Sequence, residues 1–251
     1  MKKVLITGMS GLIGGILKEH LQALGGYELS ALNRRPVEGV ECFQADISDL
    51  DAIKPALAGK DVVVHLAAYL GADDDWEQQL ASNVVGTYNI YEAARLAGVQ
   101  RVVFGSSGAV VSALEKIPPY EAIVSRRYDE VPSDWKNVTH ETVSPIGLYG
   151  ASKIWGESLG RHYSDTHGVS ALCVRIGRVT AENRPGEPRA FSVFTSHRDI
   201  AQILQKCIDA PDDLKHGIFF ATSKNKWGYR DLEHPRRVLG FEPQDSADDY
   251  L

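Results

Sequence analysis

The feature that most restricts the fold of this chain is a glycine-rich turn between a short apolar run and an amphipathic segment. Val4–Thr7 predicts a β-strand, the heptapeptide GMSGLIG follows at positions 8–14, and apolar residues then recur at helical spacing up to Leu24. Glycine lets a backbone approach a phosphate closely, and the free amides at a helix N-terminus attract its charge. This context predicts a dinucleotide-binding loop, the alternative being a purely structural turn. The residues expected at the pyrophosphate are Gly8, Ser10, Gly11, Leu12, Ile13 and Gly14.

Strand and helix patterns continue to alternate along the chain. The segment Asp61–Leu66 is apolar on both faces, as is typical of a parallel strand covered by helices on either side. Further strands are predicted at 29–32, 42–45, 101–104 and 171–175, and helices at 76–96 and 149–166. The alternation indicates an α/β fold with a doubly wound parallel sheet of the Rossmann type. Because no linker or repeat divides the sequence, we expect a single domain over residues 1–251.

Composition argues against several classes of partner. The 251 residues carry a net charge of -6, whereas nucleic-acid binding needs clustered cations. No apolar stretch approaches the roughly 20 residues that span a bilayer, and the apolar start is too short and too soon interrupted for a signal peptide. The three cysteines, Cys42, Cys173 and Cys207, are too widely spaced for a zinc site or a disulfide framework. We therefore expect a cytoplasmic protein with no metal, no nucleic-acid partner and no membrane segment.

Two arginines stand where an NAD-binding chain of this type would carry an acidic residue. A carboxylate that holds the ribose 2′-hydroxyl is expected about 20 positions after the glycine loop, and this chain has Asn33, Arg34 and Arg35 there. A guanidinium can bind a 2′-phosphate through paired charge-assisted hydrogen bonds, whereas a carboxylate would repel it. The sequence thus favours NADP over NAD, which stays possible; the alternative is that both arginines are solvated loop charges.

A tyrosine and a lysine four residues apart open the helix predicted at 149–166. This spacing places the Tyr149 phenol and the Lys153 ammonium on one helix face. A phenol ordinarily titrates near pH 10, so a tyrosine base needs a nearby positive charge. A serine pair, Ser106 and Ser107, follows the strand at 101–104, where open α/β sheets bind ligands. These residues predict proton transfer by Tyr149, although side-chain chemistry alone does not separate the two serines.

Two segments lack the periodicity of a strand or a helix. Positions 112–145 are polar and contain Pro118, Pro119 and Pro132 before ending at Pro145, and positions 181–188 contain two prolines, a glycine and Arg184. Long loops inside a compact domain are usually functional or mobile. We expect the same of 112–145.

Three short segments complete a pattern with the glycine loop and the Tyr149/Lys153 pair: Asp46-Ile47, His65–Ala68 and Asn83–Asn89. This pattern resembles the extended short-chain dehydrogenase/reductase family, also described as the NAD-dependent epimerase/dehydratase family. The resemblance implies that Ser107 faces the substrate and that the cofactor also contacts Asp46, Ile47, Leu66, Ala67, Ala68, Asn83, Tyr149, Lys153 and Ile176. From residue type alone, Asp46 could instead be a helix cap, Asn83 a surface residue and His65 a satisfied core histidine, which we prefer for His65.

Within that family, the C-terminal pattern is similar to the uronate dehydrogenase type. The segments 149–158, 174–177, 196–199 and 227–243 carry this similarity, and it places Arg189 where that group binds a sugar carboxylate. Two departures affect the substrate site: Gly108-Ala109 follows the second serine where polar residues are expected, and Arg178 replaces a small serine. The loop 112–145 is also longer than in that group, and Asn33-Arg34 departs from its NAD-type acidic residue. We expect Ser107, Gly108, Arg178 and Arg189 to contact the substrate.

The resulting hypothesis is a dehydrogenase acting on a small anionic sugar or sugar acid, with substrate-binding segments at about 178–196 and 222–251. Arg178, Arg184 and Arg189 suggest the anionic character. The alternatives are a nucleotide-sugar epimerase or dehydratase, and a regulator that senses NADP without chemistry. A regulator of that kind would not need the Tyr149/Lys153 pair. The resemblance further implies a homodimer through the helices that begin near Trp76 and Tyr149.

Overall fold

The computed structural model describes residues 1–251 and contains one seven-stranded sheet whose neighbouring strands are all parallel. Its strands, in the spatial order β3-β2-β1-β4-β5-β6-β7, are β1 (Lys2–Thr7), β2 (Tyr27–Asn33), β3 (Glu41–Gln44), β4 (Val62–His65), β5 (Arg101–Ser107), β6 (Ser170–Ile176) and β7 (His216–Ala221). This order confirms the doubly wound Rossmann-type fold. The edge strand β7 was not among the predicted strands, because its opening His216-Gly217 interrupts the apolar pattern.

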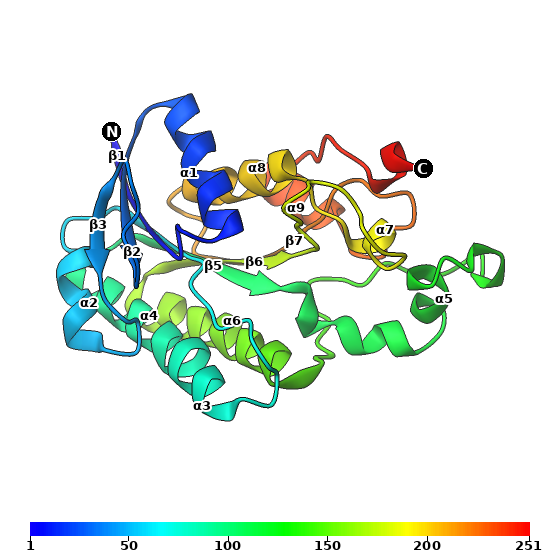
Figure 1. Ribbon diagram of the computed structural model, residues 1–251, viewed down its shortest axis with the longest axis horizontal. Helices are drawn as coiled ribbons and strands as arrows, with labels where there is room; N and C mark the ends of the chain where they lie inside the picture. Colours follow the sequence, from blue (N-terminus) through cyan, green and yellow to red (C-terminus); the bar gives the residue numbers. More distant parts are fainter.

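Helices cover both faces of the sheet (Figure 1). One face carries α1 (Leu12–Leu24), α8 (His197–Ile208) and α9 (Glu233–Leu239), and the other carries α2 (Leu50–Leu57), α4 (Gly86–Ala97) and α6 (Gly147–His167). The short helices are α3 (Trp76–Gln78), α5 (Tyr120–Val124) and α7 (Ala190–Val193). The helix predicted at 76–96 is one helical run, but a π-helical segment occupies Gln79–Val85 between α3 and α4.

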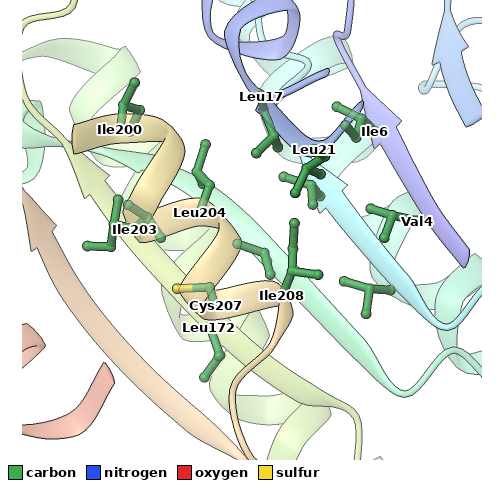
Figure 2. Packing of buried hydrophobic residues seen from close by; sticks show 14 of the residues in the cluster. Val4, Ile6, Leu17, Leu21, Leu172, Ile200, Ile203, Leu204, Cys207 and Ile208 are labelled. Carbon is green, nitrogen blue, oxygen red and sulfur yellow. The ribbon is translucent and has the colours of Figure 1, made fainter. Parts of the chain in front are cut away.

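Two apolar cores separate the sheet from its helices. In β1, Val4 and Ile6 point to the α1/α8 side, where Figure 2 shows them beside Leu21 of α1, while Leu5 points to the opposite core. All three side chains are fully buried. This alternation explains why the strands are apolar throughout rather than at every second residue.

Two glycines let α6 lie close to β5 and α4. A Cβ atom at Gly156 would lie 2.3 Å from the Phe104 ring, and one at Gly160 would lie 2.6 Å from the Tyr91 hydroxyl oxygen. Both aromatic side chains are fully buried and have no room to move. The close approach brings Lys153, on the same helix, against the carboxyl end of β5.

A third, smaller apolar cluster holds the segment 112–145 in place. It is built from buried residues of several loops and strand ends, namely Val110, Val111, Ile123, Val138, Val193, Phe220 and Tyr229. The backbone of Val138 also bonds to the C-terminal region, accepting from Asp231 N at 3.0 Å and donating to Tyr229 O at 2.7 Å. The segment is therefore packed, with α5 and 3-10 turns inside it. Periodicity does not detect such a cluster, because its members come from separate turns.

The strand order reverses between β1 and β4, which places a crevice at their carboxyl ends. Most of the residues expected to bind cofactor and substrate follow β1, β2, β3, β4, β5 and β6 at this edge of the sheet. Of the three free cysteines, Cys173 and Cys207 are buried and Cys42 is half-buried. None of the helices combines the length and the apolar character that crossing a bilayer requires.

Candidate functional site

The glycine loop forms the first part of the crevice. Gly8 has a φ of 71°, and a Cβ atom there would lie 2.7 Å from Ala67 N, whereas one at Gly14 would lie 2.4 Å from Gly8 O. Both positions therefore need glycine for the turn itself. Ser10, Gly11 and Leu12 are exposed, and no side chain caps the N-terminus of α1. Free amides on an exposed turn fit the pyrophosphate of a dinucleotide.

Asn33 fixes the shape of this loop. Its Oδ1 accepts a hydrogen bond from Met9 N at 2.9 Å, and its Nδ2 donates to Ser10 Oγ at 2.6 Å. The side chain is buried, and both ends of its amide bond the loop. The sequence had instead predicted a direct contact between Asn33 and the cofactor. Arg34 and Arg35 are both exposed at the end of β2, and the positive charge of Arg34 helps to lower the pKa of Asp46, after the larger effect of the Ser48 backbone amide.

The residues after β3 and β4 complete the cofactor side. Asp46 accepts from Ser48 N at 2.9 Å and is exposed, whereas Ile47 is buried beneath it. Ala67 N donates to Thr7 Oγ1 at 3.0 Å, which holds Leu66–Ala68 beside the glycine loop. Asn83 is buried, with its amide bonded to both the N and the O of Tyr69. Asn83 thus holds the loop after β4 in place. That Asn83 contacts the cofactor stays a prediction.

His65 is a core histidine, as we preferred. Its two ring nitrogens lie 2.8 Å from Thr7 Oγ1 and 3.3 Å from Thr87 Oγ1. Burial lowers the pKa of His65 to about 3, so the ring is neutral at physiological pH. The histidine joins β1, β4 and α4 and does not reach the crevice surface.

Tyr149 and Lys153 share one face of α6. The Lys153 Nζ lies 5.5 Å from the centroid of the Tyr149 ring and donates to Gly105 O at 2.9 Å. Ser106 and Ser107, which side-chain chemistry alone does not separate, point to different places. Ser106 Oγ donates to the buried Glu157 carboxylate at 2.6 Å, whereas Ser107 is half-buried at the crevice. The geometry therefore leaves Ser107 as the serine available to a substrate.

The protonation of this pair differs in one respect from the sequence argument. Burial raises the pKa of Tyr149, and a hydrogen-bonding interaction with Ser107 acts in the opposite direction. Burial also lowers the pKa of Lys153 to about 8, against the raising effect of Glu157. In the free chain, burial is therefore the largest influence on both groups: it raises the pKa of the phenol and lowers that of the ammonium.

A cavity of about 470 Å³ opens beside Ser107. Its lining includes the four predicted substrate residues Ser107, Gly108, Arg178 and Arg189, together with Ile176. It also contains three charged residues that we had not predicted: Glu115, Lys116 and Arg230. The exposed Arg184 lies outside the lining, so its expected contribution to the site is not seen.

Comparison with known proteins agrees with this geometry. The model of the NAD dependent epimerase/dehydratase family matches residues 4–206. The chain belongs to this family. It is 34% identical to a uronate dehydrogenase of Agrobacterium fabrum, over 99% of this chain and 86% of that protein. It is also 32% identical to an NAD-dependent glucose-6-phosphate dehydrogenase of Haloferax volcanii, over 98% and 95% of the two chains.

A solved structure extends the likeness to three dimensions. A mutant uronate dehydrogenase from Agrobacterium tumefaciens, complexed with NAD, superposes with a TM-score of 0.83 and 30% identity, covering 100% of this chain and 87% of the other. The resemblance to the extended short-chain dehydrogenases of the uronate type is therefore confirmed, as is the oxidoreductase class it implied.

The arginine that the resemblance placed at the substrate is already paired in this family member. Arg189 Nε and Nη2 bind the two carboxylate oxygens of Glu115 at 2.5 and 2.8 Å. Burial alone would raise the pKa of Glu115, but Arg189, Tyr229 and Arg230 lower it. Glu115 lies in the segment 112–145, and no local sequence pattern connects it with Arg189.

Sequence reasoning also missed Asp73, which caps the N-terminus of α6 from a distant loop. Its two carboxylate oxygens accept from Leu148 N at 3.1 Å and from Tyr149 N at 2.9 Å. An anion at this position satisfies amides at the start of α6 and favours its dipole. The only sequence signal is the acidic run 73–75, which suggests a solvated loop.

We expect Asp73→Ala to loosen the first turn of α6 and to reduce kcat by about 10-fold, because small displacements of a catalytic group are costly. Asp74→Ala, next in the chain, should leave kcat within about 2-fold, since Asp74 accepts no side-chain hydrogen bond there. Steady-state kinetics with a turned-over sugar measures both. Equal effects of the two substitutions would show that the cap does not position Tyr149.

Proposed function

We propose that this protein is an NAD(P)-dependent dehydrogenase that oxidises a hydroxyl group of a small anionic sugar or sugar acid, or catalyses the reverse reduction. The observation that supports this most directly is the position of Ser107. It lies between the Tyr149/Lys153 pair on one side and a cavity that contains three arginines on the other. A substrate hydroxyl at Ser107 would thus meet a base while its anionic group meets a guanidinium.

Each side chain has a separate task in this reaction. Ser107 Oγ holds the substrate oxygen, and Tyr149 Oη removes the hydroxyl proton as general base. Lys153 would bind the ribose next to the nicotinamide, and it places a positive charge one helical turn from the phenol. When bound, the cofactor supplies the hydride acceptor, so that the hydroxyl becomes a carbonyl. The exposed glycine loop with Ser10, Gly11 and Leu12 would hold the pyrophosphate.

The size of the cavity favours a monosaccharide. A volume of about 470 Å³ is at the lower end of the range for small-molecule sites. Besides residues at the ends of β5 and β6, the lining includes Arg178 and Arg189 from the proposed substrate segment 178–196, Arg230 from the segment 222–251, and four residues of the packed segment 112–145, namely Ser112, Glu115, Lys116 and Val124. We propose that these three parts of the single domain form the substrate site.

The experiment that tests this function is a panel of neutral sugars, uronates and sugar phosphates, each offered with NAD and with NADP. Formation of reduced nicotinamide in step with sugar consumption is the expected result, followed by absorbance. A product formed without net reduced cofactor would instead favour an epimerase or dehydratase. Cofactor binding without turnover of any sugar would favour a regulator and contradict our proposal.

We further propose that NADP is preferred over NAD and that Arg34 is responsible. Arg34→Asp should shift the ratio of kcat/KM for NADP to that for NAD toward NAD by about 10- to 100-fold, because a charge-assisted contact is replaced by repulsion. Arg237→Asp, which changes an exposed arginine of α9, serves as the charge-matched control. An unchanged ratio in Arg34→Asp would show that the arginine does not contact the 2′-phosphate.

We also propose that the protein is a cytoplasmic homodimer. On the outer side of α4 and α6, Tyr88 and Trp155 expose 43% and 40% of their surface, beside a groove that includes Leu159 and Tyr163. Aromatic residues on an exposed helix pair are typical of a subunit interface. Sedimentation of Trp155→Glu against the parent chain tests it, with a monomer expected for the variant.

A further inference from the structure

Arg230 is a buried cation for which the protein provides few partners. Only 3% of the residue is exposed, and its Nε and Nη1 atoms are buried without any hydrogen-bond partner. The remaining nitrogen, Nη2, lies 3.4 Å from the Tyr229 hydroxyl and 3.9 Å from Glu115 Oε1. The guanidinium carbon lies 5.4 Å from the Tyr229 ring and 5.9 Å from the Phe220 ring. Buried polar groups are normally hydrogen-bonded, so the two unpartnered donors make this guanidinium a candidate ligand-binding group.

The guanidinium occupies the space that a side chain at position 108 would fill. A Cβ atom on Gly108 would lie 2.2 to 2.5 Å from three atoms of the Arg230 guanidinium. Gly108 directly follows Ser107, and both line the cavity together with Arg230. The departure at Gly108 from the uronate dehydrogenase pattern therefore has a structural reason: glycine makes room for an arginine next to the proposed reaction centre.

The other arginines of the cavity are less available or less enclosed. Arg189 already binds both oxygens of Glu115, so its charge is compensated. Arg178 has 55% of its side chain exposed and lies at the cavity with a distant ion pair to Glu187 at 3.9 Å. Arg230 alone combines deep burial with free donors. Since burial strengthens a charge-assisted hydrogen bond, Arg230 is the arginine of the cavity with the donors best suited to an anion.

The charges around the cavity favour an anion over a neutral sugar. Lys116, Arg178, Arg189 and Arg230 line it, and Glu115 is its one carboxylate. This excess of positive charge lies in a chain whose net charge is -6. A local field of this sign concentrates anionic ligands at the mouth of a cavity.

We propose that Arg230, made accessible by Gly108, binds the anionic group of the substrate, a carboxylate or a phosphate ester. This inference rests on the proposed function for the identity of the ligand as a sugar. Arg189 then acts through Glu115, which holds Tyr229 and keeps the Arg230 guanidinium next to Ser107. The predicted carboxylate anchor is thereby moved from Arg189 to Arg230.

Binding of inorganic phosphate tests the anion site without any turnover. The protein is saturated with oxidised cofactor, so that the glycine loop is filled, and phosphate is titrated at constant ionic strength while thermal unfolding is followed. Arg230→Gln should weaken phosphate binding by about 10- to 100-fold, as expected for loss of hydrogen bonds to a charged group. Arg236→Gln, an exposed arginine ion-paired with Glu233, should bind phosphate like the parent chain.

Two further variants keep the test decisive if Arg230→Gln does not fold. Gly108→Ala retains every charge but displaces the guanidinium, so weaker phosphate binding is expected. Glu115→Gln removes the carboxylate that holds Tyr229 and the Arg230 guanidinium in place, so weaker phosphate binding is expected here too. Phosphate binding that is unchanged in Arg230→Gln, or in Gly108→Ala where the first variant is unfolded, overturns the proposal.

Kinetics then identifies the source of the anion. A hexuronate, a hexose 6-phosphate and the neutral hexose are compared in the parent chain and in Arg230→Gln. KM for the substrate that carries the recognised anion should rise by about 10- to 100-fold in the variant, while KM for the neutral hexose stays constant. Turnover with an unchanged KM for both anionic sugars retains the proposed function but rejects this inference. Phosphate binding that depends on Arg230, without turnover of any sugar, retains this inference but rejects the proposed function.

Discussion

Tyr149→Phe is expected to lower kcat by about 10²- to 10⁴-fold, which is the usual contribution of a positioned general base. The substitution removes one oxygen atom and retains the ring that packs 5.5 Å from the Lys153 ammonium. Helix α6 and the close approach at Gly156 are unaffected, so the fold should be intact. The measurement is the rate of reduced nicotinamide formation at saturating sugar and cofactor.

Tyr163→Phe is the matched control for this prediction. Tyr163 lies on the same helix, and its hydroxyl donates to Glu92 at 2.9 Å, away from the cavity beside Ser107. We expect its kcat to remain within about 2-fold of the parent value. Cofactor binding, followed by quenching of tryptophan fluorescence, should be preserved in both variants. A Tyr149→Phe protein that binds cofactor and turns over at the parental rate would remove the phenol from the mechanism.

The dependence of the oxidation rate on pH should reflect the environment of the Tyr149 phenol. Since burial raises the pKa of Tyr149, the deprotonated base becomes more abundant as pH increases, and oxidation should accelerate from neutral toward alkaline pH. The pKa of Lys153 is lowered to about 8, so the ammonium loses its proton in the same range. Above that value the phenolate loses its neighbouring charge, and the increase in rate should level off.

The local parts of this site could be predicted from sequence because each is encoded by neighbouring residues. The glycine turn needs only the strand and helix around it, and the face shared by Tyr149 and Lys153 follows from a spacing of four in a helix. The strands were found for the same reason, since a buried parallel strand is a continuous apolar run. Two elements have no comparable sequence pattern and were not predicted: β7, which begins with the non-apolar pair His216-Gly217, and the π-helical segment Gln79–Val85.

The substrate side could not be predicted in the same way, because its contacts join distant parts of the chain. Arg189 and Glu115 are 74 positions apart, and Asp73 caps an amide 76 positions further on. Arg230 meets Gly108 only through the third apolar cluster, which brings the C-terminal region onto the packed segment 112–145. Residue type suggested that the site is anion-binding, but only the fold distinguishes a paired arginine from a free one.

Glu157→Ala is expected to have the largest effect on stability, about 3–5 kcal/mol of the free energy of unfolding, as for other broken buried ion pairs. Glu157 and Arg175 expose 4% and 0% of their side chains and form a two-pronged contact, with both N–O distances at 2.8 Å. Ser106 Oγ donates to the same carboxylate at 2.6 Å. Removing Glu157 leaves a buried guanidinium whose one remaining bond is from Nη1 to Thr142 O.

An exposed ion pair on the same helix provides the comparison. Arg161 and Asp165 expose 61% and 54% of their side chains, so Asp165→Ala should cost no more than about 1 kcal/mol. Chemical denaturation of both variants measures the difference. Equal losses would mean that the buried pair contributes no more than a surface one. The double variant Glu157→Leu with Arg175→Met should recover much of the stability, because no unpaired charge remains.

Loss of the Glu157 charge should also change the pH dependence of the reaction, because Glu157 acts on Lys153. The carboxylate raises the pKa of Lys153 against the larger effect of burial, which lowers it to about 8. In Glu157→Gln the lysine should lose its proton at a lower pH, and the levelling of the oxidation rate should move to lower pH with it. A pH profile identical to that of the parent chain, in a folded Glu157→Gln protein, would show that the buried pair stabilises the fold without setting the charge beside the phenol.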